Sequence, residues 1–149
     1  MSQTTTDIID HEETEELLDH AEESLTGVIL GTITFLKDRQ LSVSDWAAHL
    51  GSQVAPTWDE NKGKGAREIA RMIAINVIAA GGDVHGLSGD DDRAELRCSW
   101  PDAEDLAYFK LTRDDIDPFL QLYQPIMRSL GLRYEAHREG EQATLTFTR

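Results

Sequence analysis

Cysteine and basic residues are scarce in this sequence. Cys98 is the single cysteine among 149 residues, so the chain cannot form an internal disulfide and cannot build a zinc site from thiolates. Lys and Arg number 14 against 28 Asp and Glu, which gives a net charge of −14. Nucleic acids and anionic membrane surfaces are bound through Lys and Arg, so neither is expected as a partner.

The acidic charge is concentrated at one end of the chain. Nine of the 28 acids fall in residues 1–24, which contain no Lys or Arg, so the remaining 19 acids face 14 bases. At this length one domain is expected over residues 1–149, with residues 1–12 as a disordered acidic tail. Most of the negative charge is therefore a terminal feature rather than a property of the whole surface.

Long apolar runs are also missing. The longest, from Ile69 to Ala80, covers twelve residues, includes Arg71 and Asn76, and is too short to span a membrane. The first residues, MSQTTTDIIDHEE, have neither a basic leader nor an apolar core, so we do not expect a signal peptide. The expected location is the cytoplasm of a prokaryote.

Apolar residues at spacings of three and four predict three helices in the first half. The first covers about residues 14–37, the second begins at Ser42 and ends before Pro56, and the third covers about 66–80. The third is apolar nearly all round, which indicates a central buried helix. The predicted inward face of the first helix consists of Leu18, Ala21, Leu25, Val28, Ile29, Thr32 or Ile33, and Leu36.

Two glycines interrupt the first helix. Gly27 and Gly31 lie four residues apart, and each costs about 1 kcal/mol relative to alanine in a helix interior. We expect the close approach of another helix to offset this cost. The face that carries them is also a candidate surface for pairing with a second copy of the chain.

Strands are predicted in the second half, where the period changes to two. Residues 93–100 alternate between apolar and polar side chains, and Val84–Leu87 is the expected hairpin partner. The pattern then predicts a short helix over 101–109, a helix over 117–130 that is kinked at Pro125, and a terminal hairpin over 132–147. The predicted class is α+β, in which an N-terminal helical half packs on a small antiparallel sheet that ends in a C-terminal β-hairpin.

The only candidates for catalytic residues are Cys98 and His85. Cys98 lies on the apolar face of its predicted strand, and His85 is the histidine that a neighbouring strand could bring close to it. A nucleophilic cysteine needs such a partner, which leaves open a hydrolase that uses this pair. The serine-hydrolase, phosphate-binding, dinucleotide-binding and HExxH zinc motifs are absent, and a non-enzymatic role is the preferred interpretation.

Three charged clusters are candidate ion sites. Glu16, Asp19, His20 and Glu23 share one helix face, but no second ExxH motif exists to complete a metal centre. The run Asp90–Asp92 lacks the alternating ligands of a calcium loop. Neither a metal nor another cofactor is expected. The basic run from Lys62 to Arg71 could hold an anion at a helix start, and pairing with the acidic first helix is the preferred interpretation.

The apolar side chains offer a candidate ligand site between the helices and the sheet. Asn76 is a lone amide in an apolar helix, and apolar pockets with one convergent polar group are typical of small-molecule sites. The three tryptophans lie at the junctions between predicted elements. The predicted ligand-binding residues are Trp46, Met72, Asn76, Trp100, Tyr123 and Met127.

One family resemblance supports this interpretation. The second helix contains DWAAHLG, and a long helix precedes a final hairpin, LRYEAHREGEQATLTF. Over about residues 25–149 this arrangement resembles the vinyl-reductase-type hydrocarbon-binding domains, which implies an apolar cavity, a small apolar ligand and a regulatory or carrier role. That family's hairpin commonly carries cysteines, whereas Ala136, His137 and Ala143–Leu145 occupy those positions here. The resemblance therefore implies no cysteine-dependent metal role.

Three functional hypotheses follow from the sequence. The first is a non-enzymatic domain that binds a small apolar ligand or a partner protein between helices and sheet. The second is the hydrolase using Cys98 and His85. The third is a dimeric interaction protein whose acidic segment, residues 7–23, docks on a partner; a homodimer could form through the glycine face or through the edge of the terminal hairpin.

Overall fold

The helices come first along the chain and the terminal strand pair comes last. The structure, a computed structural model, describes residues 11–149. The predicted disordered tail was residues 1–12: residues 1–10 lie outside the described part, and residues 11–12 belong to the first helix. The elements are α1 (His11–Asp38), α2 (Val43–Val54), the 3-10 helix η1 (Ala55–Asn61), α3 (Ala66–Ala79), β1 (Asp83–Gly89), β2 (Arg93–Ser99), α4 (Ala103–Phe109), α5 (Arg113–Ile116), the 3-10 helix η2 (Asp117–Leu122), α6 (Tyr123–Ser129), β3 (Arg133–Glu139) and β4 (Gln142–Thr148).

The four strands form one antiparallel sheet in the order β1-β2-β4-β3. β1 pairs with β2, and this hairpin was predicted from the sequence. The register of the pair shifts between Val84 and Gly86. β2 then pairs with β4, so that the two hairpins join in the middle of the sheet. The predicted α+β class, a helical half on a small antiparallel sheet with a terminal hairpin, is confirmed.

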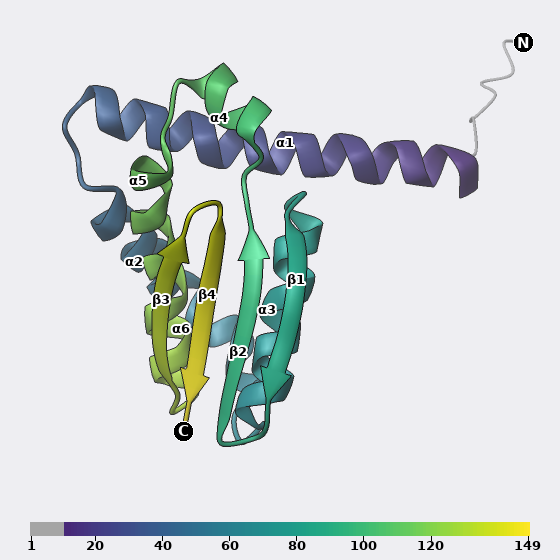
Figure 1. The fold of residues 1–149 in the computed structure, drawn as a ribbon, viewed down its shortest axis with the longest axis vertical. Coiled ribbons are helices and arrows are strands. Elements are labelled where there is room, and N and C mark those ends of the chain that lie inside the picture. The colour runs from purple at the N-terminus through teal and green to yellow at the C-terminus, as the bar shows by residue number, and fades with distance from the viewer. Residues whose placement is uncertain (1–10) are drawn as a thin grey trace, which may run out of the picture.

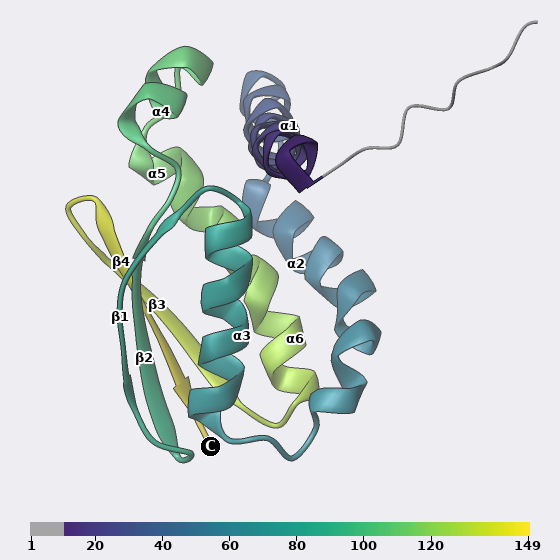
Figure 2. The same ribbon diagram turned by 90° about the vertical axis from the view of Figure 1, so that its right-hand side faces the viewer.

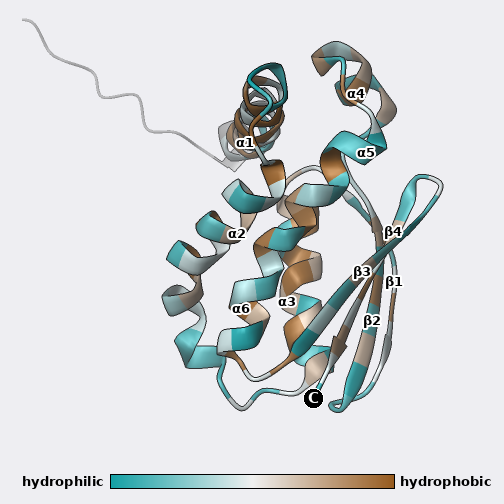
Figure 3. Cartoon of the chain, turned by 90° about the vertical axis from the view of Figure 1, so that its left-hand side faces the viewer, coloured by the Kyte–Doolittle hydropathy of each residue, from teal (hydrophilic) through white to brown (hydrophobic). Residues whose placement is uncertain are grey.

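α3 and α6 cover one face of the sheet, and α2 lies beyond them as a further layer (Figure 2). The covered face carries apolar side chains at alternate positions, among them Leu96, Leu145 and Phe147, which are fully buried. Figure 3 shows that apolar residues concentrate in α3, which packs on β1 and β2. The uncovered face is polar, with Arg97 and Thr144 paired across β2 and β4. Burial of one face thus sets the strand register.

α3 is not buried all round, contrary to the prediction. Ile69, Ala70 and Ile73 are fully buried against the sheet, but Ile75 and Ile78 are 51 % and 56 % exposed. The helix is a surface helix with one apolar face inside and a second one outside. The sequence of α3 shows that two of its faces are apolar. It does not show that only one of these faces is covered by another element.

α1 lies across one end of the sheet and extends past β1 (Figure 1). Only part of its predicted inward face is buried: Leu30 and Ile33 are fully covered, whereas Leu18 is 64 % exposed. The expected close approach of another helix at the glycines is also wrong within this chain. A side-chain carbon at Gly27 would meet no atom within 4 Å, and one at Gly31 would meet only the Phe109 ring, at 4.0 Å.

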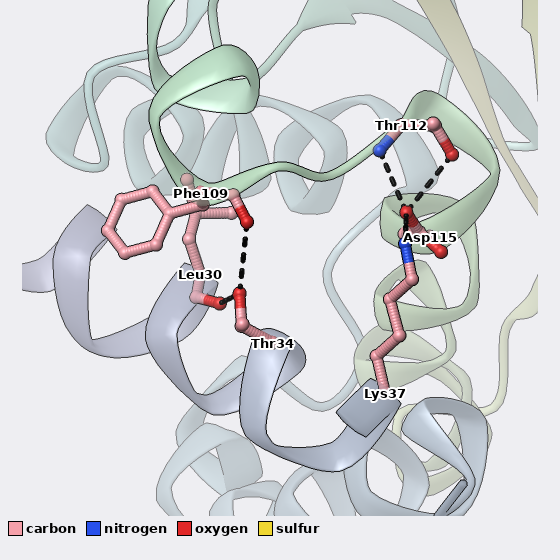
Figure 4. A network of polar contacts seen from close by, with 6 residues as sticks. All are labelled: Leu30, Thr34, Lys37, Phe109, Thr112 and Asp115. Carbon is pink, nitrogen blue, oxygen red and sulfur yellow. Dashed lines mark hydrogen bonds and ion pairs between the residues drawn. The ribbon is translucent and has the colours of Figure 1, made fainter. Parts of the chain in front are cut away.

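The C-terminal half of α1 is fastened to the α4–α5 segment (Figure 4). Thr34 Oγ1 bonds the carbonyl oxygens of Leu30, at 3.0 Å, and Phe109, at 3.5 Å. Lys37 Nζ donates to Asp115 Oδ2 at 2.8 Å, and the same carboxylate accepts from the Thr112 backbone N–H. These contacts hold one half of the helix and leave the other half projecting.

The predicted kinked helix over residues 117–130 is two elements. Residues 117–122 form the 3-10 helix η2, and α6 starts at Tyr123, so Pro125 lies in the first turn of an α-helix instead of kinking one. Proline lacks an N–H and is tolerated there because first-turn donors have no partner within the helix. The chain around Pro56, where the second helix was expected to end, likewise continues as the 3-10 helix η1.

Within residues 11–149, no helix is both long enough and apolar enough to cross a membrane.

Candidate functional site

A cavity of about 500 Å³ lies between the helices and the sheet. Its walls come from α1, α2, η1, α3, η2, α6 and the covered face of the sheet. Nearly all of the lining side chains are apolar. Cavities of roughly 300–1,000 Å³ with apolar walls and a few polar groups are typical of small-molecule sites, and a well-packed core would not leave such a space.

All three tryptophans of the chain line this cavity. Trp46 stacks on Phe119 with ring centroids 5.5 Å apart, and Trp100 contacts the same ring at 5.9 Å. Trp58 lies at the other side, where η1 follows α2. Indoles provide large rigid apolar walls, and their position makes the intrinsic fluorescence of the protein a direct reporter of anything that enters.

The cavity opens to solvent between α1 and α3. Leu25 and Val28 of α1 line it although they are 44 % and 68 % exposed, and the exposed Asn76 lines it from α3. The mouth is therefore apolar on the α1 side and carries an amide on the α3 side. Asn76 lies at the mouth and not, as the sequence suggested, as a buried polar group in the core.

The inner wall carries the cavity's one charged side chain among the described residues. Arg138 of β3 pairs with Ala143 of β4, and Ala143 pairs in turn with Cys98 of β2. All three residues line the cavity. The Arg138 side chain is only 12 % exposed, and its Nε donates to Asp117 Oδ1 at 2.5 Å. Two small side chains thus lie beside a buried guanidinium.

Tyr123 supplies a hydroxyl near this wall. Burial, and the adjacent Cys98, raise the pKa of Tyr123 well above its ordinary value, so the phenol stays neutral and can donate. The Tyr123 hydroxyl has no hydrogen-bond partner within the described residues, whereas the neighbouring Tyr134 hydroxyl donates to Leu120 O at 3.1 Å. Every fully buried side-chain N or O atom in the described part has a partner, so the unpaired hydroxyl borders open space.

The structure brings together four of the six predicted ligand-binding residues. Trp46, Asn76, Trp100 and Tyr123 line the cavity. Met72 and Met127 do not: Met127 is fully buried, and both pack in the core cluster between α3, α6 and the sheet. Methionine at helical spacing could belong to either a core or a pocket, and the sequence does not distinguish them.

Arg138 is the site residue that the sequence reasoning missed. In the terminal hairpin Tyr134, Ala136 and Arg138 alternate, so the same period that turns Tyr134 inward also turns Arg138 inward. The alternation of the strand is therefore a signal in the sequence that places Arg138 on the covered face of the sheet.

Cys98 and His85 do not form a catalytic pair. His85 Nε2 is 2.7 Å from Ser99 Oγ, on the strand position next to Cys98, which faces the opposite side of the sheet. The Cys98 thiol is buried, and that burial raises its pKa to about 11 despite the positive charge of Arg138. A catalytic cysteine needs the opposite shift.

The charged clusters pair locally. His20 lies 3.7 Å from Glu16 and 4.0 Å from Glu23 on an exposed helix face. Lys62 and Lys64 pair with Asp59 and Glu68 and not, as expected, with α1. In the part of the chain that the structure describes, no group of three or more His, Cys, Asp or Glu side chains is arranged to hold a metal ion.

Comparison of the chain with protein-family models and with curated protein sequences finds no match.

Proposed function

We propose that this protein is a non-enzymatic cytoplasmic binding protein that holds a small, mainly apolar molecule between its helices and its sheet, in a regulatory or carrier role. The observation that carries the proposal is the cavity of about 500 Å³, walled by three tryptophans and open at one side. An open apolar cavity forfeits packing contacts along its lining, and a ligand would restore them. The buried Cys98 with its raised pKa favours binding over catalysis.

The test uses N-phenyl-1-naphthylamine, a neutral apolar fluorophore, as the probe. We expect saturable binding with quenching of the tryptophan fluorescence, because all three indoles line the cavity. Native mass spectrometry of the purified protein would show any molecule that remains bound.

A matched pair of substitutions separates the cavity from other apolar surfaces. Ala143→Met fills the inner wall, and Ala136→Met adds the same group at an exposed position on the neighbouring strand, outside the cavity. We expect Ala143→Met alone to weaken probe binding at least tenfold. Equal affinity in both variants, with native circular dichroism, would refute the proposal.

We infer that a second copy of the chain covers the exposed side of α1. Positions 18, 21, 25, 28, 32 and 35 repeat at alternating spacings of three and four, which is the pattern of a helix that packs on another helix. Leu18 and Phe35 on this stripe are 64 % and 49 % exposed. The stripe is apolar except at Thr32, and none of its residues belongs to the buried core of its own chain.

Charge favours α3 of the second copy as the docking partner. The projecting half of α1 is acidic, whereas Arg71, which makes no ion pair within the described residues, lies on the outer face of α3 one turn before the exposed Ile75. Because Asn76 of α3 lines the cavity mouth, a helix docked here would also narrow the opening.

Light scattering after size exclusion tests this pairing. We expect a dimer that Leu18→Glu converts to a monomer, since Leu18 lies on the stripe but not in the cavity. Gln53→Glu on α2 adds the same charge at an exposed helical position outside the stripe and should leave the dimer intact. A monomeric wild-type protein at every concentration would exclude the second copy.

A further inference from the structure

We propose that the ligand is amphipathic and carries one anionic group, a carboxylate, which Arg138 binds at the inner wall of the cavity. This inference rests on the binding function proposed above and names the chemical class of the ligand. It starts from an unusual combination: an apolar cavity whose lining, among the described residues, includes a single charged side chain.

The position of Arg138 leaves room for a ligand group in front of it. The next residues along the same row of the sheet are Ala143 and Cys98, both small and both in the lining. A larger residue at either position would occupy the space beside the guanidinium. Across these three strands, the guanidinium of Arg138 therefore lies beside two small side chains that leave space for a ligand group.

The counter-ion of Arg138 lies outside the cavity. Asp117 accepts from Arg138 Nε and lines a second, shallower pocket together with Ser44 and Gln121, but it does not line the apolar cavity. Arg138 lines both pockets and so lies between them, and it brings a positive charge to the apolar cavity while its carboxylate partner lines only the second pocket. An anion at the inner wall would meet a positive charge in a low-dielectric setting, where such attraction is strong.

The guanidinium keeps donors available for a ligand. Arg138 Nε is used by Asp117 and Nη1 donates to the carbonyl oxygen of Glu141 at 3.1 Å, while Nη2 has no partner within the described residues. Because arginine has five N–H donors in a fixed planar fork, two bonds on its outer side orient the group and leave the others free. The orientation is set before the ligand arrives, which lowers the entropic cost of binding.

Tyr123 gives the same end of the cavity a second donor. Its hydroxyl has no partner within the described residues, and Tyr123 lines the cavity together with Cys98, the neighbour of Ala143 in the row that starts at Arg138. One oxygen of a carboxylate can accept from the arginine while the other accepts from the phenol. The remaining walls, from Trp46 to Trp58, fit the apolar body.

The experiment compares one probe in two forms, 11-(dansylamino)undecanoic acid and its methyl ester, in which a neutral head group one methyl larger replaces the negative carboxylate. Binding is followed by dansyl fluorescence and by tryptophan quenching. We expect the wild-type protein to bind the acid at least tenfold more tightly than the ester.

Two variants assign this preference to Arg138. Arg138→Met removes the charge, and Arg138→Met with Asp117→Asn removes the charge together with its outer partner, so that no carboxylate is left unpaired if the single variant folds poorly. We expect both variants to bind the acid only as tightly as they bind the ester. Arg138→Lys keeps a charge without the fork and should retain part of the preference.

The outcomes separate this inference from the function on which it rests. Equal wild-type affinity for acid and ester would overturn the carboxylate while leaving apolar binding intact. An equal loss of acid and ester binding in the Arg138 variants would mean that Arg138 is only structural, and would also overturn it. Failure of the wild-type protein to bind either form would refute the binding function itself.

Discussion

The indole N–H of Trp100 donates a hydrogen bond of 2.7 Å to the carbonyl oxygen of Ala80, at the C-terminal end of α3. The same oxygen accepts from Thr26 Oγ1 of α1 at 2.8 Å. The last carbonyls of a helix have no partner within the helix, so this acceptor joins α1, α3 and the end of β2 at a single point. The cavity mouth lies between the elements that it joins, and its shape depends on these two bonds.

Trp100→Phe should therefore loosen the mouth as well as the fold. Loss of the hydrogen bond costs about 1 kcal/mol and the smaller ring leaves a gap, so we expect the free energy of unfolding to fall by roughly 1–3 kcal/mol. Urea denaturation followed by circular dichroism measures it. Thr26→Val removes the other bond to Ala80 at nearly constant shape and should cost less.

The double variant checks whether the shared acceptor matters. With both donors gone, the Ala80 carbonyl is unpaired in a partly buried position, so the combined loss should exceed the sum of the single losses by about 0.5 kcal/mol or more. Strict additivity would show that the two bonds act independently.

We expect substitution by alanine to have opposite effects on protein stability at two helical glycines. A side-chain carbon at Gly51 of α2 would overlap the carbonyl oxygen of Leu122 and lie 2.9 Å from Pro125 Cγ, whereas one at Gly27 would meet nothing within 4 Å. Gly51→Ala forces α2 away from η2 and α6 and should cost about 1–3 kcal/mol. Gly27→Ala should stabilise the monomer by about 0.5–1 kcal/mol, measured by urea denaturation.

The Gly27 result also bears on pairing. If Gly27→Ala destabilised the protein in a concentration-dependent way, a helix of a second copy would approach α1 at Gly27, as the sequence first suggested for this face. If Gly27→Ala instead increased stability at all protein concentrations, any contact with a second copy would be made by the Leu18–Phe35 stripe and not at Gly27.

The sequence predicts most of the helices and strands, but not which elements lie next to one another in the fold. Period-two alternation identified β2 and the terminal hairpin because one face of each strand is buried, and the same rule holds in the structure for Leu96 and Phe147. Ser42 was recognised as a helix start and does accept from the Asp45 backbone N–H at 3.0 Å. Such signals are local, so they can be read without knowing the tertiary structure.

The misassigned features depend on contacts distant in the sequence. Leu18 and Ile78 are apolar at helical spacing, which marks an apolar face but does not say whether anything covers it; both are exposed. Met127 satisfied the pattern of a pocket residue and is in the core instead. Arg138 acquires its importance only when β3, β4 and η2 meet, because Asp117, its partner, is 21 residues away along the chain.

Cys98 should react slowly with thiol reagents. Burial raises its pKa from 9.0 to about 11, so the thiolate fraction at pH 8 is about one-hundredth of that of an ordinary cysteine, and access is limited as well. We expect slow reaction with 5,5′-dithiobis(2-nitrobenzoic acid) in the native state and one fast thiol in urea. Because Cys98 lines the cavity, a bound apolar probe should slow the reaction further.

The control variant carries its only thiol at an exposed position. Ser88→Cys, at an exposed position of β1, in a Cys98→Ser background should react at the rate of a free thiol. Fast native reaction of Cys98 itself would contradict the buried position and would reopen the hydrolase hypothesis.

The contact between α1 and α5 should weaken in acid. Burial alone would raise the pKa of the Asp115 carboxyl, but hydrogen bonds from Lys37 and Thr112 outweigh burial and hold this pKa below its ordinary value of 3.8. A group whose pKa is lower in the folded state stabilises the fold while it is ionised. Its contribution is therefore complete above the unfolded pKa and is lost as the pH falls through the lower, folded pKa.

Asp115→Asn removes this titration and isolates its effect. The variant should lose roughly 0.2–1 kcal/mol of stability at pH 7, the range for partly exposed ion pairs, and the difference from wild type should shrink steadily below about pH 4. Thermal unfolding from pH 7 to pH 3 measures it, and Asp114→Asn, an exposed neighbour outside the ion pair, is the control. A wild-type advantage that stays constant down to pH 3 would show that the Asp115 carboxylate does not hold α1 through its charge.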